Sequence, residues 1–155
     1  MKKYILLLLL PLIFSCKKDD CKFTDSNIIA TADEIAQIEA YLDERSLTAT
    51  RHSSGFFYSI TEPGTGAAPG LCSVVTVKYM GELENGDIFD ANINGIKFRL
   101  GNLIAGWQKG LPLIKAGGKI KLYIPPSLGY GSKDLIIIPP NSMLIFDIEL
   151  VAVED

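Results

Sequence analysis

Four stretches of the chain decide the fold: VVTVKYMGELENGDIFDA (74–91), IKFRLGNLIAGWQKGL (96–111), KIKLYIPPSLGYGS (119–132) and IIIPPNSMLIFDIELV (136–151). Apolar and polar residues alternate along most of them, which is the period-two pattern of strands with one covered face. In the first stretch Val75, Val77 and Tyr79 share one side, while Thr76 and Lys78 share the other. The same alternation recurs in three later segments: 96–100, 119–124 and 144–150. We therefore expect an antiparallel sheet with one apolar face that the chain covers and one face left open to solvent.

A short helix is the expected cover for the apolar face. Residues 103–111 would place three apolar side chains on one helical face: Ile104, Trp107 and Leu111. Gly106 and Gly110 weaken this helix by about 0.5–1 kcal/mol each relative to alanine, but they allow its backbone to lie close to the sheet. Asn85-Gly86 is a strong signal for the tight turn of a hairpin. The expected fold class is α+β, a bent antiparallel β-sheet wrapped around a short α-helix.

A second helix is expected before the sheet. Thr31 and Glu34 form a capping-box pattern, in which a hydroxyl and a carboxylate satisfy free N–H groups at a helix start. Residues 32–45 then read as an amphipathic helix, because apolar residues recur at helical spacing: Ile35, Ile38 and Leu42. This helix would either pack on the main domain or form a weak dimer contact. Residues 46–54 are polar and typical of a turn, and residues 55–60 are the expected first strand.

The first residues of the chain have the pattern of an export signal. Lys2 and Lys3 precede an apolar run at residues 5–10, which is too short for the ~20 residues of a membrane-spanning helix. Ser15 directly before Cys16 resembles the lipobox of bacterial lipoproteins, in which the cysteine is acylated. The alternative is an ordinary cleaved signal with a cysteine there by chance.

Composition excludes several classes of protein. The 155 residues and 16.9 kDa leave room for one modest core. The net charge of -3 and pI of about 5.2 give no reason to expect nucleic acid as a partner. The single histidine, His52, and the scattered cysteines offer no expected metal site or cofactor. With Cys16 acylated, Cys21 and Cys72 either pair, in a compartment where disulfides persist, or are two unrelated thiols.

Several motifs occur in the order and spacing of one known family: VKYMGEL (77–83), NG (85–86), FD (89–90), FRLG (98–101), IAGW (104–107), GYG (129–131), IIPP (137–140) and LIFDIEL (144–150). Together they cover roughly residues 55–153, and they resemble the FK506-binding-protein type of peptidyl-prolyl isomerase. Three departures from the family pattern are visible, one of which is a short loop between Gly101 and Leu103. Ile96 stands where many members have an aromatic residue, and residues 131–136 form a segment one residue shorter than in the best-known small members.

The resemblance implies a set of site residues. The implied catalytic residues are Asp90, Tyr130, Trp107, Tyr79 and Phe146. The implied substrate-binding residues are Phe89, Phe98, Leu103, Ile104 and Ile137. Trp107 would be the floor under the proline ring, Tyr130 and the backbone of Ile104 would hydrogen-bond the substrate chain, and Asp90 would lie beside the carbonyl that turns. On burial alone, Phe98, Phe146 and Trp107 are better explained as core residues than as site residues.

Two neighbouring residues of this set conflict with simple alternation. Asp90 has the parity of Ile88, so a regular strand would turn Asp90 inward and Phe89 outward. A pocket lined by both residues requires the strand to end or to form a bulge at this point.

The resemblance also implies a function and a location. It implies a prolyl isomerase that assists the folding of exported proteins, with proline-containing polypeptides as partners and without a cofactor or metal. The alternatives are a non-catalytic module of the same fold that binds proline-containing chains, and a structural envelope lipoprotein that assembles through residues 32–45.

The expected organisation has three parts. Residues 1–15 are a lipoprotein signal, residues 16–54 a tether with the N-terminal helix, and residues 55–155 the isomerase domain. The protein would be lipid-anchored at the cell envelope, and Lys17 after the cysteine favours the outer membrane. The sequence leaves the face of the membrane and the oligomeric state open.

Overall fold

The computed structural model describes residues 21–154, which form one six-stranded sheet, two α-helices and three short 3-10 turns. The strands are β1 (Thr50–Arg51), β2 (Phe57–Glu62), β3 (Val74–Leu83), β4 (Ile88–Arg99), β5 (Gly118–Ile124) and β6 (Leu144–Glu154). They lie in the order β1-β2-β5-β6-β3-β4, and every neighbouring pair is antiparallel. The helices are α1 (Ala32–Glu44) and α2 (Ala105–Gly110), and the 3-10 turns are η1 (Leu100–Asn102), η2 (Leu111–Leu113) and η3 (Pro126–Leu128).

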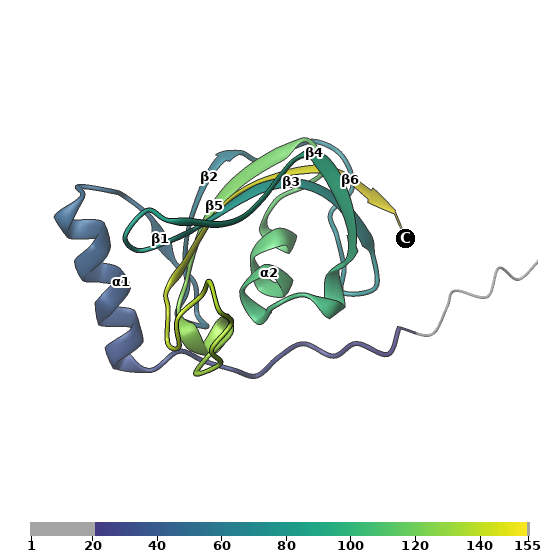
Figure 1. Ribbon diagram of the computed structural model, residues 1–155. Coiled ribbons are helices and arrows are strands. Elements are labelled where there is room, and N and C mark those ends of the chain that lie inside the picture. Colours follow the sequence, from purple (N-terminus) through teal and green to yellow (C-terminus); the bar gives the residue numbers. More distant parts are fainter. Residues whose placement is uncertain (1–20, 155) are drawn as a thin grey trace, which may run out of the picture.

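The sheet curves around α2, as the alternation of its strands and the apolar face of the helix predict (Figure 1). The main core lies between them and contains Trp107 and Leu111 from the helical segment. A Cβ on Gly106 would lie 2.6 Å from Ile124, and one on Gly110 would lie 2.7 Å from Leu122. Both glycines therefore let α2 approach the sheet more closely than any other residue could. The expected α+β class, with a bent sheet around a short helix, is confirmed.

The outer face of the sheet is not simply open to solvent, which corrects the expectation of a sheet covered on one side only. Helix α1 lies on the outside of the sheet (Figure 1) and packs its apolar side against it. A second buried cluster forms there, with Ile38 and Leu42 of α1 against Phe57, Tyr123 and Ile145 of three strands. The apolar stripe of α1 is therefore buried within its own chain. Of the two roles expected for this helix, the structure shows packing on the domain.

The start of α1 has the predicted capping box. The Thr31 hydroxyl accepts the N–H of Glu34 at 3.3 Å, and the Glu34 carboxylate accepts the N–H of Thr31 at 2.8 Å. The hairpin at Asn85-Gly86 also forms as predicted, between β3 and β4. Strand β1 was not predicted, because its two residues lie inside the segment expected to be a turn and pair there with β2.

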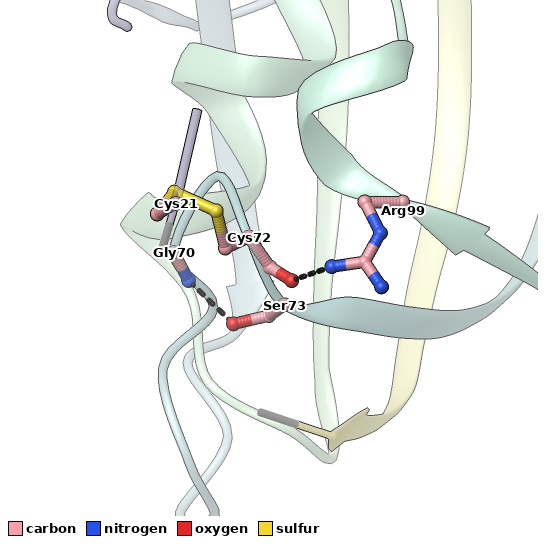
Figure 2. The surroundings of a disulfide bond; sticks show 5 residues. All are labelled: Cys21, Gly70, Cys72, Ser73 and Arg99. Carbon is pink, nitrogen blue, oxygen red and sulfur yellow. Dashed lines mark hydrogen bonds between the residues drawn. A yellow bond between two sulfur atoms is a disulfide. The ribbon is translucent and has the colours of Figure 1, made fainter. Parts of the chain in front are cut away.

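The segment before α1, residues 21–31, crosses the domain beneath α2 (Figure 1), and we call it the strap. Its first residue, Cys21, forms a disulfide with Cys72, so the pairing that the sequence left open exists (Figure 2). The Cα atoms of the two cysteines are 5.6 Å apart. The carbonyl of Cys72 also accepts a hydrogen bond from Arg99 at 2.6 Å, which joins the disulfide to the end of β4.

Further along, the strap makes contacts other than the disulfide. The Phe23 ring lies so close to Gly101 that a Cβ there would come within 2.3 Å of it. Asp25 forms an ion pair with Lys109 of α2 at 2.8 Å, and the Lys109 side chain is only 9% exposed. The strap is therefore part of the folded domain and not a free linker.

The expected signal at residues 1–15, the acylated Cys16 and the polar residues 17–20 lie outside the described part of the chain. Within residues 21–154, neither helix has the length and hydropathy needed to cross a bilayer.

Candidate active site

A cavity of about 260 Å³ opens between α2 and the concave side of the sheet. Its lining brings together nine of the ten residues that the sequence assigned to the site, together with Asn102. The lining residues are Tyr79, Phe89, Asp90, Phe98, Asn102, Leu103, Ile104, Trp107, Tyr130 and Phe146. The cavity is smaller than the roughly 300–1,000 Å³ of sites for drug-sized ligands, so it suits a single side chain or ring.

Trp107 forms the centre of an aromatic cluster. Three rings meet it edge to face: Tyr79 at 5.3 Å, Phe98 at 6.5 Å and Phe146 at 5.2 Å between ring centroids. Phe89 in turn meets Phe146 edge to face at 5.5 Å. Edge-to-face packing is a favoured arrangement for aromatic pairs, and each contact holds its neighbours in place. The cavity therefore has rigid aromatic walls.

The indole N–H of Trp107 is the unusual group in this cluster. Trp107 is 4% exposed, and within residues 21–154 its Nε1 is buried without a hydrogen-bond partner. Leaving a buried donor unpaired costs about 1–3 kcal/mol. The tryptophan is thus held in the cavity by apolar packing and not by its polar atom.

A bulge in β4 brings Phe89 and Asp90 to the same cavity. Gly81 of β3 pairs with Asp90, whereas the next residue, Glu82, pairs with Ile88. Phe89 is therefore the extra residue of a β-bulge, and the residue after it no longer follows strict alternation. The conflict of parity that the sequence showed at these two positions is resolved in this way.

The Asp90 carboxylate accepts a hydrogen bond from the Tyr79 hydroxyl at 2.6 Å. Burial, reinforced by this bond and by the charge of Asp90, raises the pKa of the Tyr79 hydroxyl. The phenol therefore remains protonated and continues to donate at any physiological pH. Its bond holds the carboxylate at the edge of the aromatic cavity.

The second polar group of the cavity is the Tyr130 hydroxyl. Tyr130 lies between two glycines, and Gly131 has a φ of +61°, which permits the sharp turn after the tyrosine. Burial, with a smaller effect from the charge of Asp90, raises the pKa of Tyr130, so this phenol is also a donor at neutral pH. Asp90 of β4 and Tyr130, which follows η3, thus line the same cavity although they are far apart in sequence.

The rim of the cavity is formed by the segment that leads into α2. The Gln108 side chain donates to the carbonyls of Gly101 at 3.0 Å and Leu103 at 2.7 Å, which fixes this segment against the helix. Asn102 joins the lining here, and sequence reasoning missed it. The available signal was its position directly before Leu103, a residue that the resemblance assigned to the site.

Ile137 is the one assigned residue that the structure does not bring to the cavity. Its side chain is 61% exposed, whereas Ile138 is buried in the main core. Leu135 and Ile138 bond to each other across a tight turn, and Ile136 has a φ of +52°. This turn rotates the run of three isoleucines so that the third one, and not the second, faces inward.

The arrangement can bind an apolar ring and two polar backbone groups, but it has little means of breaking a covalent bond. Asp90 is the one carboxylate in the lining, which contains no histidine, cysteine or serine. Within residues 21–154, no three residues of the metal-binding types are grouped closely enough to hold an ion. These features define an α+β domain with a small aromatic cavity that has room for an apolar ring.

A family model described as "FKBP-type peptidyl-prolyl cis-trans isomerase" matches residues 66–151, more than half of the chain, and the chain belongs to this family. Over 105 residues it is 47% identical to the FKBP-type peptidyl-prolyl cis-trans isomerase FkpA of Escherichia coli, an alignment that covers 66% of this chain. A probable FKBP-type peptidyl-prolyl cis-trans isomerase of Haemophilus influenzae is 43% identical over 104 residues and 64% of this chain. The alignments span 39% and 43% of these two relatives, so the chain matches about two fifths of their length.

Solved structures agree with this assignment. The crystal structure of FkpA from Escherichia coli superposes with a TM-score of 0.71 at 41% identity, covering 79% of this chain and 60% of FkpA. A peptidyl-prolyl cis-trans isomerase from Pseudomonas syringae pv. tomato superposes with a TM-score of 0.70 at 30% identity, covering 85% of this chain and 99% of that one.

Proposed function

We propose that the protein catalyses cis–trans isomerisation of peptide bonds that precede proline, in polypeptides that place the proline ring over Trp107. The observation that carries this proposal is the cavity of about 260 Å³, with its aromatic walls and a single carboxylate at the edge. Isomerisation breaks no covalent bond, so it needs no nucleophile and no metal. The similarity to isomerases of the same family supports the proposal independently.

The physical basis is the charge distribution of the amide. Rotation has a barrier of about 18–20 kcal/mol, because the twisted bond loses its resonance. As resonance is lost, charge leaves the carbonyl oxygen, and the twisted imide is less dipolar than the planar forms. A dry aromatic cavity destabilises the planar dipole more than the twisted one. This difference lowers the barrier, since only interactions that favour the transition state raise the rate.

The polar groups of the cavity orient the substrate chain while the prolyl bond turns. The Tyr130 hydroxyl donates to a substrate carbonyl near the rim. The Ile104 carbonyl already accepts the N–H groups of Trp107 and Gln108, so the N–H of Ile104 is the group left for a substrate carbonyl. The Asp90 carboxylate, fixed by Tyr79, lies beside the carbonyl that changes orientation. Because the flanking atoms are held in place, the binding energy favours rotation about the one prolyl bond.

An exchange assay on short X-Pro peptides tests this proposal, using protein that lacks residues 1–16. We expect acceleration over buffer, and a loss of it when Asp90 is replaced by valine. Glu39→Gln, an exposed carboxylate on α1, is the matched control and should retain full activity. Peptide binding without acceleration would show instead a non-catalytic module that holds proline-containing chains.

We also propose that the protein works at the cell envelope, attached by lipid on Cys16 and assisting the folding of exported proteins. The Cys21–Cys72 disulfide supports export, because such bonds persist in oxidising compartments and are rare in the cytosol. Labelling cells with a fatty acid tests the anchor: wild type should incorporate the label, and Cys16→Ser should not. Label in both proteins would exclude Cys16 as the site of attachment. Fractionation of the membranes then tests the outer-membrane location.

The domain organisation follows from the same proposal. Residues 1–15 would be removed, residues 16–54 would supply the anchor and α1, and residues 55–155 the isomerase domain. The alternative of an envelope protein that assembles through α1 loses its main support, because Ile35, Ile38 and Leu42 are buried against the sheet.

A further inference from the structure

A carboxylate at the start of α1 is bonded to the turn that carries Tyr130. Glu34 Oε1 accepts the backbone N–H of Ser127 at 2.8 Å, and Glu34 Oε2 accepts the Ser127 hydroxyl at 2.9 Å. The two residues are 93 positions apart in sequence. This pair therefore joins the N-terminal helix to the segment between β5 and β6.

The turn that Glu34 binds also holds both sides of Tyr130. Ser127 is the middle residue of η3, and the carbonyl of Pro126 in the same turn accepts two N–H groups. These come from Gly129 at 3.0 Å and Gly131 at 2.8 Å, the two neighbours of Tyr130. The backbone on each side of the tyrosine is thus fixed to a turn that is itself bonded to Glu34.

Helix capping does not account for the Ser127 contacts. A capping box needs one carboxylate oxygen, and here Oε2 of Glu34 accepts from Thr31 N at 2.8 Å. Oε1 is left for the N–H of Ser127, and Oε2 accepts the Ser127 hydroxyl in addition to Thr31 N. A carboxylate can accept at both oxygens, whereas the amide of glutamine has only one acceptor oxygen. The residue type at position 34 therefore matches a double role.

The helix that carries Glu34 is itself fixed at several points. Ile38 is fully buried against the sheet. Further along, Gln37 donates to the Glu84 carboxylate at 3.1 Å, and Arg45 donates to the Glu84 carbonyl at 3.5 Å. Helix α1 can therefore serve as a fixed support for the turn. The hydrogen bonds also keep Glu34 charged: burial opposes ionisation, but the bonds from Thr31 and Ser127 outweigh it and lower the pKa.

We propose that Glu34 is a positioning residue for the candidate active site, which holds η3 so that the Tyr130 hydroxyl stays in place to bind the substrate backbone. This inference rests on the proposed function, because the hydroxyl of Tyr130 has a role only if the cavity takes a peptide. Helix α1 lies outside the family-matched residues 66–151, and the inference gives it an influence on substrate binding through η3 and Tyr130.

The test compares Glu34→Ala with Thr31→Ala in the otherwise unchanged protein. Both variants damage the cap of α1, but only Glu34→Ala removes the bonds to Ser127. We expect Glu34→Ala to raise KM by roughly three- to tenfold with little change in kcat, because a bond made in both ground and transition states is lost. Thr31→Ala should lower the thermal stability yet keep KM within roughly twofold of wild type. Glu34→Gln, which retains one acceptor, should fall between wild type and Glu34→Ala.

Two further readouts locate the effect. In a Tyr130→Phe background, Glu34→Ala should add little, because the group that it positions is already missing. Hydrogen exchange of the Gly129 and Gly131 amides should be faster in Glu34→Ala and unchanged in Thr31→Ala. If Glu34→Ala does not fold well enough to assay, Ser127→Ala removes only the hydroxyl bond and should raise KM by a smaller factor.

The outcomes separate this inference from the proposed function. Equal effects of Glu34→Ala and Thr31→Ala on KM and on amide exchange would reduce Glu34 to a helix cap and overturn the inference. If wild-type protein shows no isomerase activity, the proposed function fails. Peptide affinity, read from the fluorescence of Trp107, then replaces KM in the same comparison, and a wild-type affinity in Glu34→Ala would overturn the positioning role.

Discussion

The Tyr79 hydroxyl and the Asp90 carboxylate form a 2.6 Å hydrogen bond at the edge of an aromatic cavity. Tyr79 pairs with Asn92 and Gly81 pairs with Asp90, so Tyr79 and Asp90 are diagonal neighbours on one face of the paired strands. The bulge that follows at Phe89 adds this ring to the same cavity, while the bond fixes the one negative charge of the site.

We expect Asp90→Val to lower kcat/KM by roughly tenfold or more, in the range typical of a group that acts on the reacting centre. Asp90 is exposed, so the midpoint of urea unfolding should remain near that of wild type. Tyr79→Phe should lower kcat/KM less, and should add little when Asp90 is already valine. Steady-state kinetics and urea titration of the three variants measure both properties. A large loss of stability in Asp90→Val would mean that this residue is structural.

A peptide containing proline should change the fluorescence of the protein. The chain has one tryptophan, Trp107, and this residue lines the cavity. Occupation of the cavity would therefore alter the surroundings of the only indole. A peptide with alanine in place of proline is the matched control and should give a much smaller change. An equal response to both peptides would argue against a proline-binding cavity.

Replacing both Cys21 and Cys72 by serine should lower the free energy of unfolding. The bond closes a loop with a sequence separation of 51 residues, and the chain-entropy relation gives about 4 kcal/mol for a loop of that size. Urea unfolding with and without a reducing agent measures this contribution. Reductant should destabilise wild type and leave the double variant unchanged. If the urea midpoint of the wild type were the same with and without the reductant, the bond would not be formed in solution.

The stability of the protein should depend on the charge of Glu34 in acid. Its pKa lies below the ordinary 4.5 in the folded state, because the bonds from Thr31 and Ser127 outweigh burial. A lowered folded pKa stabilises the protein above the unfolded pKa, and this contribution is lost as the pH falls from about 4.5 through the folded value. The difference in unfolding free energy between wild type and Glu34→Gln should therefore shrink between pH 6 and pH 3. A constant difference over that range would contradict the ionised link.

The sequence predicted which side of each strand a residue occupies better than it predicted what covers that side. Tyr123 does lie on the face opposite Ile120 and Leu122, as alternation requires, but it is buried. Its cover is α1, which comes from a distant part of the chain. Periodicity shows to which side of its strand a side chain points. Burial depends on which distant segment packs against that side, and no local sequence pattern identifies the segment.

The site was predictable where local conflict or motif spacing carried information. Phe89 and Asp90 could not both face the cavity on a regular strand, so their conflict pointed to the bulge that the structure contains. The three isoleucines at 136–138 offered no such signal, because any one of them satisfies an apolar environment. Ile136 adopts a φ of +52°, which β-branched residues rarely do, and this turn decided between Ile137 and Ile138. The partner of Cys21 likewise depends on the path of the strap, which composition does not reveal.

The disulfide also limits how far the folded domain can lie from the proposed lipid anchor. With the lipid on Cys16, as we propose, Cys21 is five residues away, and an extended chain of five residues reaches roughly 18 Å. Because Cys72 fastens Cys21 to the domain, this point of the domain would lie within that distance of the bilayer surface. Polypeptides would then meet the isomerase close to the membrane, and not in the open volume beyond it.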